Sequence, residues 1–328
     1  YIAGVYWMAG GEMVSFGVIL AMSQYVSRFW QPITNLANIY NSFINNIAYL
    51  ERIFETMDEP VEVDDVPGAE ELPPITGEVD FEDVTFAYEE GINILEHVNL
   101  HVRAGESIAL VGPTGAGKST VINLLCRFYN LNGGRILLHG KDGKAHDIHE
   151  VTLHSLRSQM GIMLQDSFIF SGTLMDNIRY GRLDATDEEV IEAARRVRAD
   201  DFIRTMRGGY ETTVNERGGN LSQGQKQLIA LARTLLSDPS ILILDEATSC
   251  IDTQTEKLLQ EGIQEILKGR TSFIIAHRLS TIKNCDRILY IGNKGILESG
   301  SHDELMAKHG LYYQLYTTQA KSAGGPVE

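Results

Sequence analysis

A glycine-rich segment, residues 112–120, limits what this chain can fold into more than any other part of its sequence. The segment reads Gly-Pro-Thr-Gly-Ala-Gly-Lys-Ser-Thr and matches the pattern G-x-x-x-x-G-K-[ST]. An apolar run at 107–111 precedes it, and Val121, Leu124 and Leu125 follow at helical spacing. A strand that turns through such a loop into a helix directs backbone N–H groups at one point, where phosphate binds. The sequence therefore predicts a phosphate-binding loop, and a chance glycine-rich turn explains the flanking strand and helix poorly.

Two side chains of this loop are expected to do more than line it. Lys118 should reach the β- and γ-phosphates of a nucleotide and stabilise charge during hydrolysis, and the Ser119 hydroxyl should be a ligand of Mg²⁺. The rest of the loop should contact the nucleotide through its backbone. The predicted nucleotide-binding residues of the loop are Gly112, Pro113, Thr114, Gly115, Ala116, Gly117, Lys118, Ser119 and Thr120.

A second apolar run, residues 241–244, ends in two carboxylates, Asp245 and Glu246. Asp245 is placed to hold the Mg²⁺ shell. Glu246 lies where the chain leaves the strand, and there it can act as the general base toward an attacking water. The alternative for paired acids after a strand is a helix N-cap. With a phosphate loop upstream, the catalytic interpretation is favoured.

The fold class follows from the alternation of short apolar runs with helical stretches from Val79 onward. Residues 107–111, 241–244 and 272–276 are continuous apolar runs, which is typical of strands buried on both faces. Strands that alternate with helices in this way predict an α/β domain with a mostly parallel central sheet.

The N-terminal zone is different, because residues 1–50 contain only two charged side chains, Glu12 and Arg28. Its apolar run at 13–22 is short for a membrane span of about 20 residues, so hydropathy leaves open a span or a buried or amphipathic helix of a soluble protein. Only Pro32 breaks the helical pattern between Glu12 and Thr56. A helix over that stretch would be about 65 Å long, enough to cross a bilayer and project beyond it.

Composition and charge add expectations about a linker, the partners and the cysteines. Residues 57–78 hold eight acidic residues, no basic ones and four of the chain's eight prolines, which predicts an extended acidic linker. The net charge of −16 argues against a nucleic-acid partner, which would require a basic face. The three cysteines are expected to be reduced core residues. The start at Tyr1, without a signal-peptide pattern, suggests a piece of a longer protein.

Several other segments resemble one known family. Residues 221–225, Leu-Ser-Gln-Gly-Gln, are similar to the signature peptide of ATP-binding cassette (ABC) proteins. Gln165 resembles the Q-loop glutamine, and His277 the switch histidine. Residues 249–252, which end in Asp252, resemble the D-loop, and Tyr88 resembles the aromatic that stacks on adenine.

The resemblance covers residues 79–320 as a nucleotide-binding domain, with 321–328 as a flexible tail. Residues 216–218 are similar to a short exporter segment, and 1–56 resemble the last membrane helix of an exporter with its cytosolic extension. The overall match is to bacterial multidrug-type ABC half-transporters. It implies a P-loop NTPase (RecA-like) core with an antiparallel β-subdomain and an α-helical subdomain, preceded by a long transmembrane-type helix.

The same resemblance implies a mechanism. ATP and Mg²⁺ would lie between two cassettes arranged head to tail, in a homodimer or a heterodimer. Glu246, His277, Gln165 and Lys118 would be the catalytic residues, and Ser119, Gln165 and Asp245 the metal ligands. Nucleotide contacts beyond the loop would come from Tyr88, Gln165, Ser222, Gly224, Gln225 and Asp252. The partners would be a second cassette and the remaining helices of an exporter in the cell membrane, with the cassette on the cytoplasmic side.

Two departures from the family pattern bear on this expectation. Gln223 stands where glycine is usual in the signature, and Cys250-Ile251 where Ala-Leu is usual in the D-loop. Neither removes a catalytic group. A soluble ABC ATPase, an importer subunit and a regulatory cassette that only binds ATP remain as alternatives, and the transported substrate is not indicated by the sequence.

Overall fold

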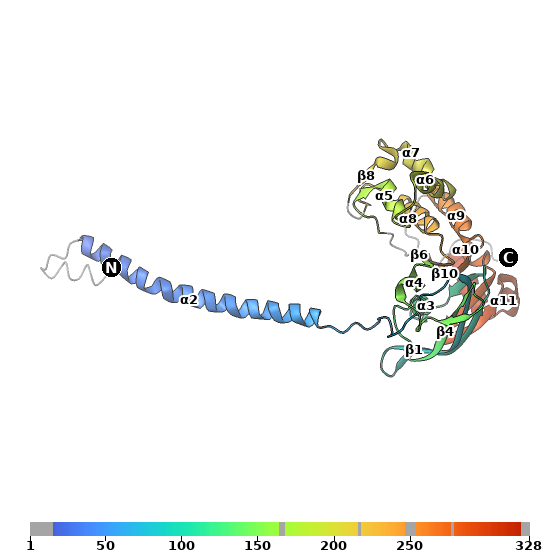
Figure 1. The fold of residues 1–328 in the computed structure, drawn as a ribbon, viewed down its shortest axis with the longest axis horizontal. Coiled ribbons are helices and arrows are strands. Elements are labelled where there is room, and N and C mark those ends of the chain that lie inside the picture. Colours follow the sequence, from blue (N-terminus) through green and yellow to red (C-terminus); the bar gives the residue numbers. More distant parts are fainter. Residues whose placement is uncertain (1–15, 164–167, 216–217, 247–252, 277–278, 323–328) are drawn as a thin grey trace. The chain divides into compact units, whose positions relative to one another are not determined.

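The computed structural model describes residues 16–163, 168–215, 218–246, 253–276 and 279–322, and the chain forms two compact units. The first unit covers Tyr1–Val61 and the second Glu62–Glu328. Figure 1 shows the helices and strands of both units as a ribbon.

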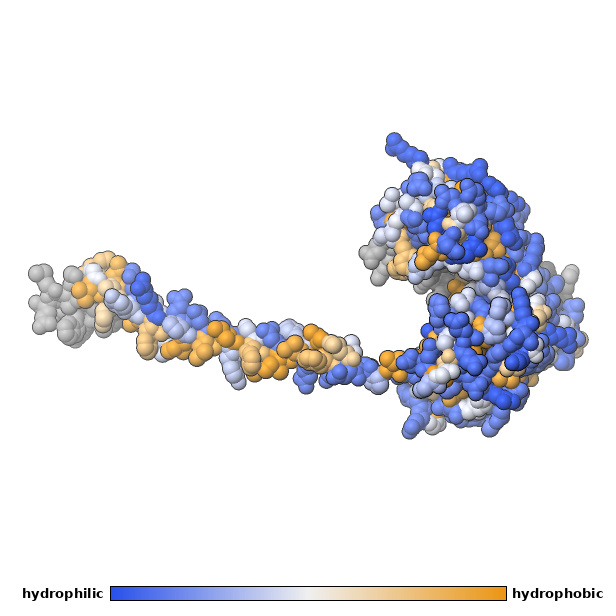
Figure 2. Space-filling view, viewed as in Figure 1, coloured by the Kyte–Doolittle hydropathy of each residue, from blue (hydrophilic) through white to orange (hydrophobic). Residues whose placement is uncertain are grey.

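The first unit contains one long helix, α2 (Phe16–Met57), which continues through Pro32. None of its residues is buried, and Figure 2 shows hydrophobic side chains gathered along much of its length. The long N-terminal helix that the sequence predicts is therefore confirmed. Over the part of the chain that the structure describes, no helix is both long enough and apolar enough to cross a membrane.

The second unit is built around a mixed central sheet in which all neighbouring strands are parallel except the antiparallel edge strand β12. Across the sheet the strands lie in the order β12 (Gly295–Gly300), β11 (Arg287–Gly292), β3 (Ser107–Val111), β10 (Thr271–Ala276), β9 (Ile241–Glu246) and β6 (Met160–Met163). The predicted α/β class with a mostly parallel sheet is confirmed.

Both faces of the central strands β3, β9 and β10 are buried, which explains why these strands are mostly apolar. Along β3, Ala109 and Val111 belong to one hydrophobic core, whereas Ile108 and Leu110 belong to a second core on the other face. The helices that lie between or after the strands of this sheet in the sequence are α3 (Lys118–Leu125), α4 (Leu153–Arg157), α9 (Thr253–Leu267), α10 (Leu279–Lys283), α11 (His302–Lys308) and α12 (Leu311–Ser322).

An antiparallel sheet lies against the second core. Its strands are in the order β2 (Ile92–Val102), β1 (Ile75–Glu89), β4 (Gly133–Gly140) and β5 (Ala145–Asp147). The inward residues of β1, such as Val79 and Phe81, are buried, while Glu78 and Asp80 between and beside them are half-buried. This is the β-subdomain that the family resemblance implies.

A helical segment follows β6 in the chain. It contains β7 (Gly172–Thr173), α5 (Leu174–Arg179), α6 (Asp187–Arg196), α7 (Ala199–Thr205), η1 (Gly209–Glu211), β8 (Thr213–Val214) and α8 (Gln223–Leu236). Helix α8 packs against α5, α6, α7 and α9, and ten of its residues are buried. This segment corresponds to the helical subdomain expected from the resemblance.

Within the second unit, a buried arginine holds the part of the acidic segment around Asp64. The guanidinium of Arg127, which is 1% exposed, donates to the carbonyl oxygens of Asp64, Ile148 and Val151. Burial lowers the pKa of Arg127, and nearby acids such as Asp65 act in the opposite direction. Strand β1 begins at Ile75, within the segment that composition assigns to the linker.

Two of the three cysteines, Cys126 and Cys285, are described, and both are buried thiols that form no disulfide, in agreement with the expected reduced core residues; the Cys285 Sγ donates to the Thr281 carbonyl oxygen at 3.2 Å. Burial raises the pKa of Cys126 to about 12, so its thiol stays protonated and unreactive at neutral pH.

Candidate nucleotide site

Four parallel strands end together at one edge of the central sheet. Residues pair across the sheet as Leu110 with Ile275, Asp245 with Ile275, and Leu244 with Met163. The carboxyl ends of β3, β10, β9 and β6 therefore meet at a common edge. In open α/β sheets this edge is where ligands bind.

The phosphate loop leaves β3 at this edge, and its glycines have geometry that other residues could not adopt. Gly112 has φ +141°, and a Cβ placed there would lie 2.2 Å from the carbonyl oxygen of Ile291. Gly117 has φ +101° and is the N-cap of α3. Both glycines are needed for the tight curl that brings the loop N–H groups to the start of the helix.

Lys118 is the first residue of α3 and turns back over the loop. Its Nζ donates to the carbonyl oxygens of Gly112 and Pro113, at 2.9 and 2.8 Å. Burial lowers the pKa of Lys118, and the negative charge of Asp245 opposes that shift. The predicted phosphate contact and the predicted metal ligand are thus close enough to interact electrostatically.

Tyr88 lies near the end of β1, and its side chain reaches the phosphate loop. Its hydroxyl is 3.2 Å from the Thr120 Oγ1, and its ring packs edge-on against Phe86 and Tyr129, with centroids 4.8 and 4.9 Å apart. The Asn123 amide also donates to the Tyr88 hydroxyl, at 3.4 Å. The ring is 47% exposed, so it can offer surface to a ligand at the loop.

These observations support a fit between the loop and a nucleoside triphosphate with its metal. The glycine cradle excludes side chains, and Thr114, Gly115 and Ser119 are exposed. The one basic side chain of the loop is held by two carbonyl oxygens that a phosphate could replace as partners. Asp245 is half-buried beside them and supplies an oxygen ligand of the kind that Mg²⁺ prefers.

The signature peptide forms the start of α8. Ser222 is the N-cap: its Oγ accepts from the Gln225 backbone N–H at 3.3 Å, and its own N–H donates to Gln225 Oε1 at 2.9 Å. Ser222 is exposed and Gly224 is buried. A capped helix N-terminus of this length is an anion-binding element. A serine ahead of a helical run is a common N-cap, and Ser222 occupies that position.

Four of the predicted site residues have no described side chain. Gln165, Asp252 and His277 lie outside the described residues, and of Glu246 only the backbone is described, as the last residue of β9. The strands that lead to Gln165 and His277 end at Met163 and Ala276, on the common edge.

Two residues that contact Tyr88 were not predicted from the sequence. Asn123 lies in the second half of α3, and Tyr129 lies in the turn after that helix; neither residue belongs to a motif. Asn123 follows Ser119 by one helical turn, so helical spacing alone could have predicted that Asn123 lies on the same face of α3 as the loop residue Ser119. Tyr129 offered no such signal.

Comparison with known proteins places this geometry in a family. The family described as ABC transporter matches residues 95–249. The chain is 48% identical over 318 residues to a Bacillus subtilis protein named "Uncharacterized ABC transporter ATP-binding protein YfiC", a match that covers 97% of this chain and 52% of that protein. It is 47% identical over 315 residues to a "Fatty acid ABC transporter ATP-binding/permease protein" of Mycobacterium bovis, covering 96% of this chain and 48% of that one.

A solved structure is also similar. The bacterial Atm1-family ABC exporter with ATP bound matches with a TM-score of 0.75 and 40% sequence identity, over 93% of this chain and 53% of that one. The chain spans about half the length of the curated relatives it matches.

Proposed function

Because the chain belongs to the ABC transporter family, we propose that it is the ATP-hydrolysing part of an ABC exporter. The observation that carries this proposal is the common edge of the sheet, where the phosphate loop, Lys118 and Asp245 meet. An anion cradle with one lysine and a metal-ligating carboxylate suits the triphosphate of ATP.

Each described residue has a distinct role in this proposal. The loop N–H groups and Lys118 bind the β- and γ-phosphates, and Lys118 neutralises charge that develops during hydrolysis. Ser119 and Asp245, with Gln165, are the ligands for Mg²⁺. Held by these residues, Mg²⁺ would supply positive charge that stabilises the phosphate groups. Tyr88 stacks on the adenine.

Glu246 and His277 complete the chemistry. Glu246 accepts a proton from the attacking water, and His277 contacts the γ-phosphate. The position of Glu246 at the end of β9, one residue beyond Asp245, supports its assignment as the base. The presence of both residues disfavours a cassette that only binds ATP.

We propose that a second cassette supplies the other half of each site. Ser222, Gly224 and Gln225 start α8, and with Asp252 they would face the nucleotide held by the neighbouring chain. A helix N-terminus that presents N–H groups to the γ-phosphate favours closure on ATP. Closure on ATP and opening after hydrolysis would move attached membrane helices between two states.

The names of the similar proteins support an exporter. They name a fatty acid transporter, a lipid A-core flippase and a putative multidrug export protein, which favours a drug-like or lipid cargo over the peptide that the family resemblance also allows. In this proposal α2 joins the remaining helices of a membrane domain, and the cassette faces the cytoplasm. The fusion of α2 to the cassette disfavours an importer subunit or a soluble ABC ATPase.

Phosphate release by the purified chain tests the proposed activity. With ATP and Mg²⁺ present, the rate should rise more steeply than linearly with chain concentration, because the active species is a pair. A rate strictly proportional to concentration would contradict the pairing. ATP binding without phosphate release at any concentration would instead identify a regulatory cassette.

The role of Tyr88 has its own test. Tyr88→Ala should weaken ATP binding by about 5- to 30-fold, since one base stacked on an aromatic side chain contributes about 1–2 kcal/mol. Tyr88→Phe keeps the ring and should bind ATP nearly as the parent does. Isothermal titration with ATP measures both. Equal affinity for the alanine variant and the parent would remove Tyr88 from the adenine site.

A further inference from the structure

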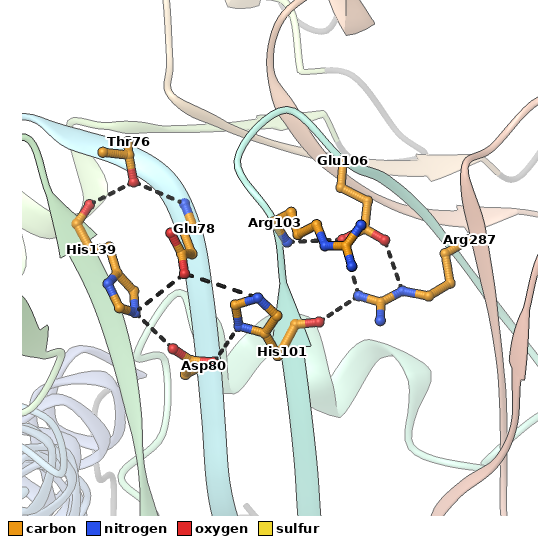
Figure 3. A network of polar contacts seen from close by, with 8 residues as sticks. All are labelled: Thr76, Glu78, Asp80, His101, Arg103, Glu106, His139 and Arg287. Carbon is orange, nitrogen blue, oxygen red and sulfur yellow. Dashed lines mark hydrogen bonds and ion pairs between the residues drawn. The ribbon is translucent and has the colours of Figure 1, made fainter.

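A cluster of metal-ligating side chains lies outside the nucleotide site, on the solvent-facing side of the antiparallel sheet. Glu78 and Asp80 come from β1, His101 from β2 and His139 from β4, and Figure 3 shows all four side chains pointing toward one another. They converge because Glu78 and Asp80 are two residues apart on one face of a strand. His101 pairs directly with Asp80 across the sheet, and β4 pairs on the other side.

The donor atoms of the cluster lie within reach of a single ion. His139 Nε2 lies 2.7 Å from Asp80 Oδ2 and 3.9 Å from Glu78 Oε1. One donor atom each from Glu78, Asp80 and His139 fall within 4.8 Å of one another. Donors on a tetrahedral metal with bonds near 2.0–2.1 Å are about 3.3 Å apart, so small side-chain shifts would bring these atoms onto one ion.

His101 has a different place in the cluster. Its Nδ1 is 2.7 Å from Asp80 Oδ1, the carboxylate oxygen that does not face His139. This hydrogen bond orients the Asp80 carboxylate and leaves its Oδ2 atom able to bind a metal ion, as hydrogen-bond partners of metal-binding carboxylates commonly do. Burial raises the pKa of Asp80, but the hydrogen bonds with His139 and His101 outweigh it and the pKa is lowered. Asp80 is therefore ionised at neutral pH.

The cluster is also tied to the central sheet. The carbonyl oxygen of His101 accepts from Arg287 Nη2, and Arg287 of β11 forms an ion pair with Glu106 at 2.9 Å (Figure 3). Thr76 Oγ1 donates to the carbonyl oxygen of His139 at 3.0 Å. Strands β1, β2 and β4 are thus held in register at the place where the four side chains meet.

We propose that Glu78, Asp80 and His139 form a binding site for a divalent transition-metal cation of the zinc type, with His101 as the positioning residue. One imidazole with two carboxylates suits zinc, and a water molecule would fill the fourth position. Mg²⁺ prefers an octahedral shell of oxygen atoms and suits this site poorly. A bound ion would join β1 to β4 directly, with β2 attached through the His101–Asp80 hydrogen bond, and so stabilise the β-subdomain.

Zinc titration of the nucleotide-free full chain tests the site. Zinc chloride, titrated in the presence of millimolar Mg²⁺, should bind at one site per chain and raise the thermal unfolding midpoint. His139→Gln and Glu78→Gln should each weaken zinc binding about tenfold or more and remove the thermal shift, and His101→Gln should weaken it about tenfold.

A matched control lies on the same sheet. His97 Nδ1 is 2.8 Å from Asp83 Oδ1, a His–Asp pair with a similar separation but more exposed side chains that is not part of the cluster. His97→Gln should leave zinc binding unchanged, as should Asp245→Asn, which removes a proposed Mg²⁺ ligand of the nucleotide site and so separates the two sites. The proposal fails if the parent binds no zinc under these conditions, if His139→Gln binds zinc as the parent does, or if His97→Gln loses the same affinity.

Discussion

Replacing Lys118 with alanine is expected to weaken ATP binding by about 10- to 100-fold, and phosphate release should fall below detection. The lysine ammonium is the one basic group of the loop, and a hydrogen bond from a charged donor contributes about 1.5–3 kcal/mol. In the structure its Nζ already points over the loop, bound to the carbonyl oxygens of Gly112 and Pro113. The alanine variant removes that group without touching the glycine cradle. Isothermal titration with ATP measures the loss.

The control for this variant is Lys268→Ala. The Lys268 ammonium is 2.6 Å from a Glu265 carboxylate oxygen at the surface, with the lysine side chain 72% exposed. Its loss changes the net charge by the same amount, so it corrects for any general effect of charge on ATP binding. Unchanged ATP affinity in Lys118→Ala would refute the phosphate-loop assignment.

Glu246→Gln should keep ATP affinity close to that of the parent but lower the rate of phosphate release by about 10²- to 10⁴-fold, the usual contribution of a general base. The amide preserves the size of the side chain and cannot accept the proton of the attacking water. Because ATP persists, the chains should accumulate as a stable pair, which size-exclusion chromatography with ATP and Mg²⁺ would detect.

The control here is Glu71→Gln, an exposed carboxylate in the segment ahead of β1. It should hydrolyse ATP at the parent rate and form no stable pair. If Glu246→Gln released phosphate as fast as the parent, another group would have to be the base.

The parts of this molecule that depend on local sequence were predictable. The strand, loop and helix over 107–125 are adjacent in the chain, and their motif fixes the backbone and the ligand together. The buried parallel strands could also be predicted, because both of their faces are covered and most of their positions are therefore apolar. The cap at Ser222 followed from the same local logic.

Features that depend on pairing between distant strands were not predictable. Glu78, His101 and His139 meet only because β1 pairs with β2 and β4, and nothing in the single sequence fixes that register. The burial of Arg127 was equally hidden, since arginine is usually exposed and its partners are backbone carbonyl oxygens. Tyr129 reaches Tyr88 by the same kind of tertiary contact.

For the N-terminal helix, composition predicts the helix itself but not its surroundings. The scarcity of charge in residues 1–50 and the helical pattern predicted one long helix, and α2 confirms it. The surroundings of an apolar helix are set by its partners, so its hydropathy could not decide between lipid, protein and water.

A mixing experiment tests most directly the central claim that two chains share each ATP site. Chains carrying Lys118→Ala lack a working phosphate loop, and chains carrying Ser222→Arg lack a working signature; each alone should release no phosphate. In a head-to-tail pair of one chain of each kind, one site combines an intact loop with an intact signature.

The equimolar mixture should therefore recover phosphate release, up to about a quarter of the parent rate, since half of the pairs are mixed and each has one of two sites intact. Thermal unfolding would first confirm that Ser222→Arg is folded, because Ser222 caps α8. Recovery of phosphate release in the mixture is the predicted result. A mixture as inactive as either folded variant alone would contradict the shared site.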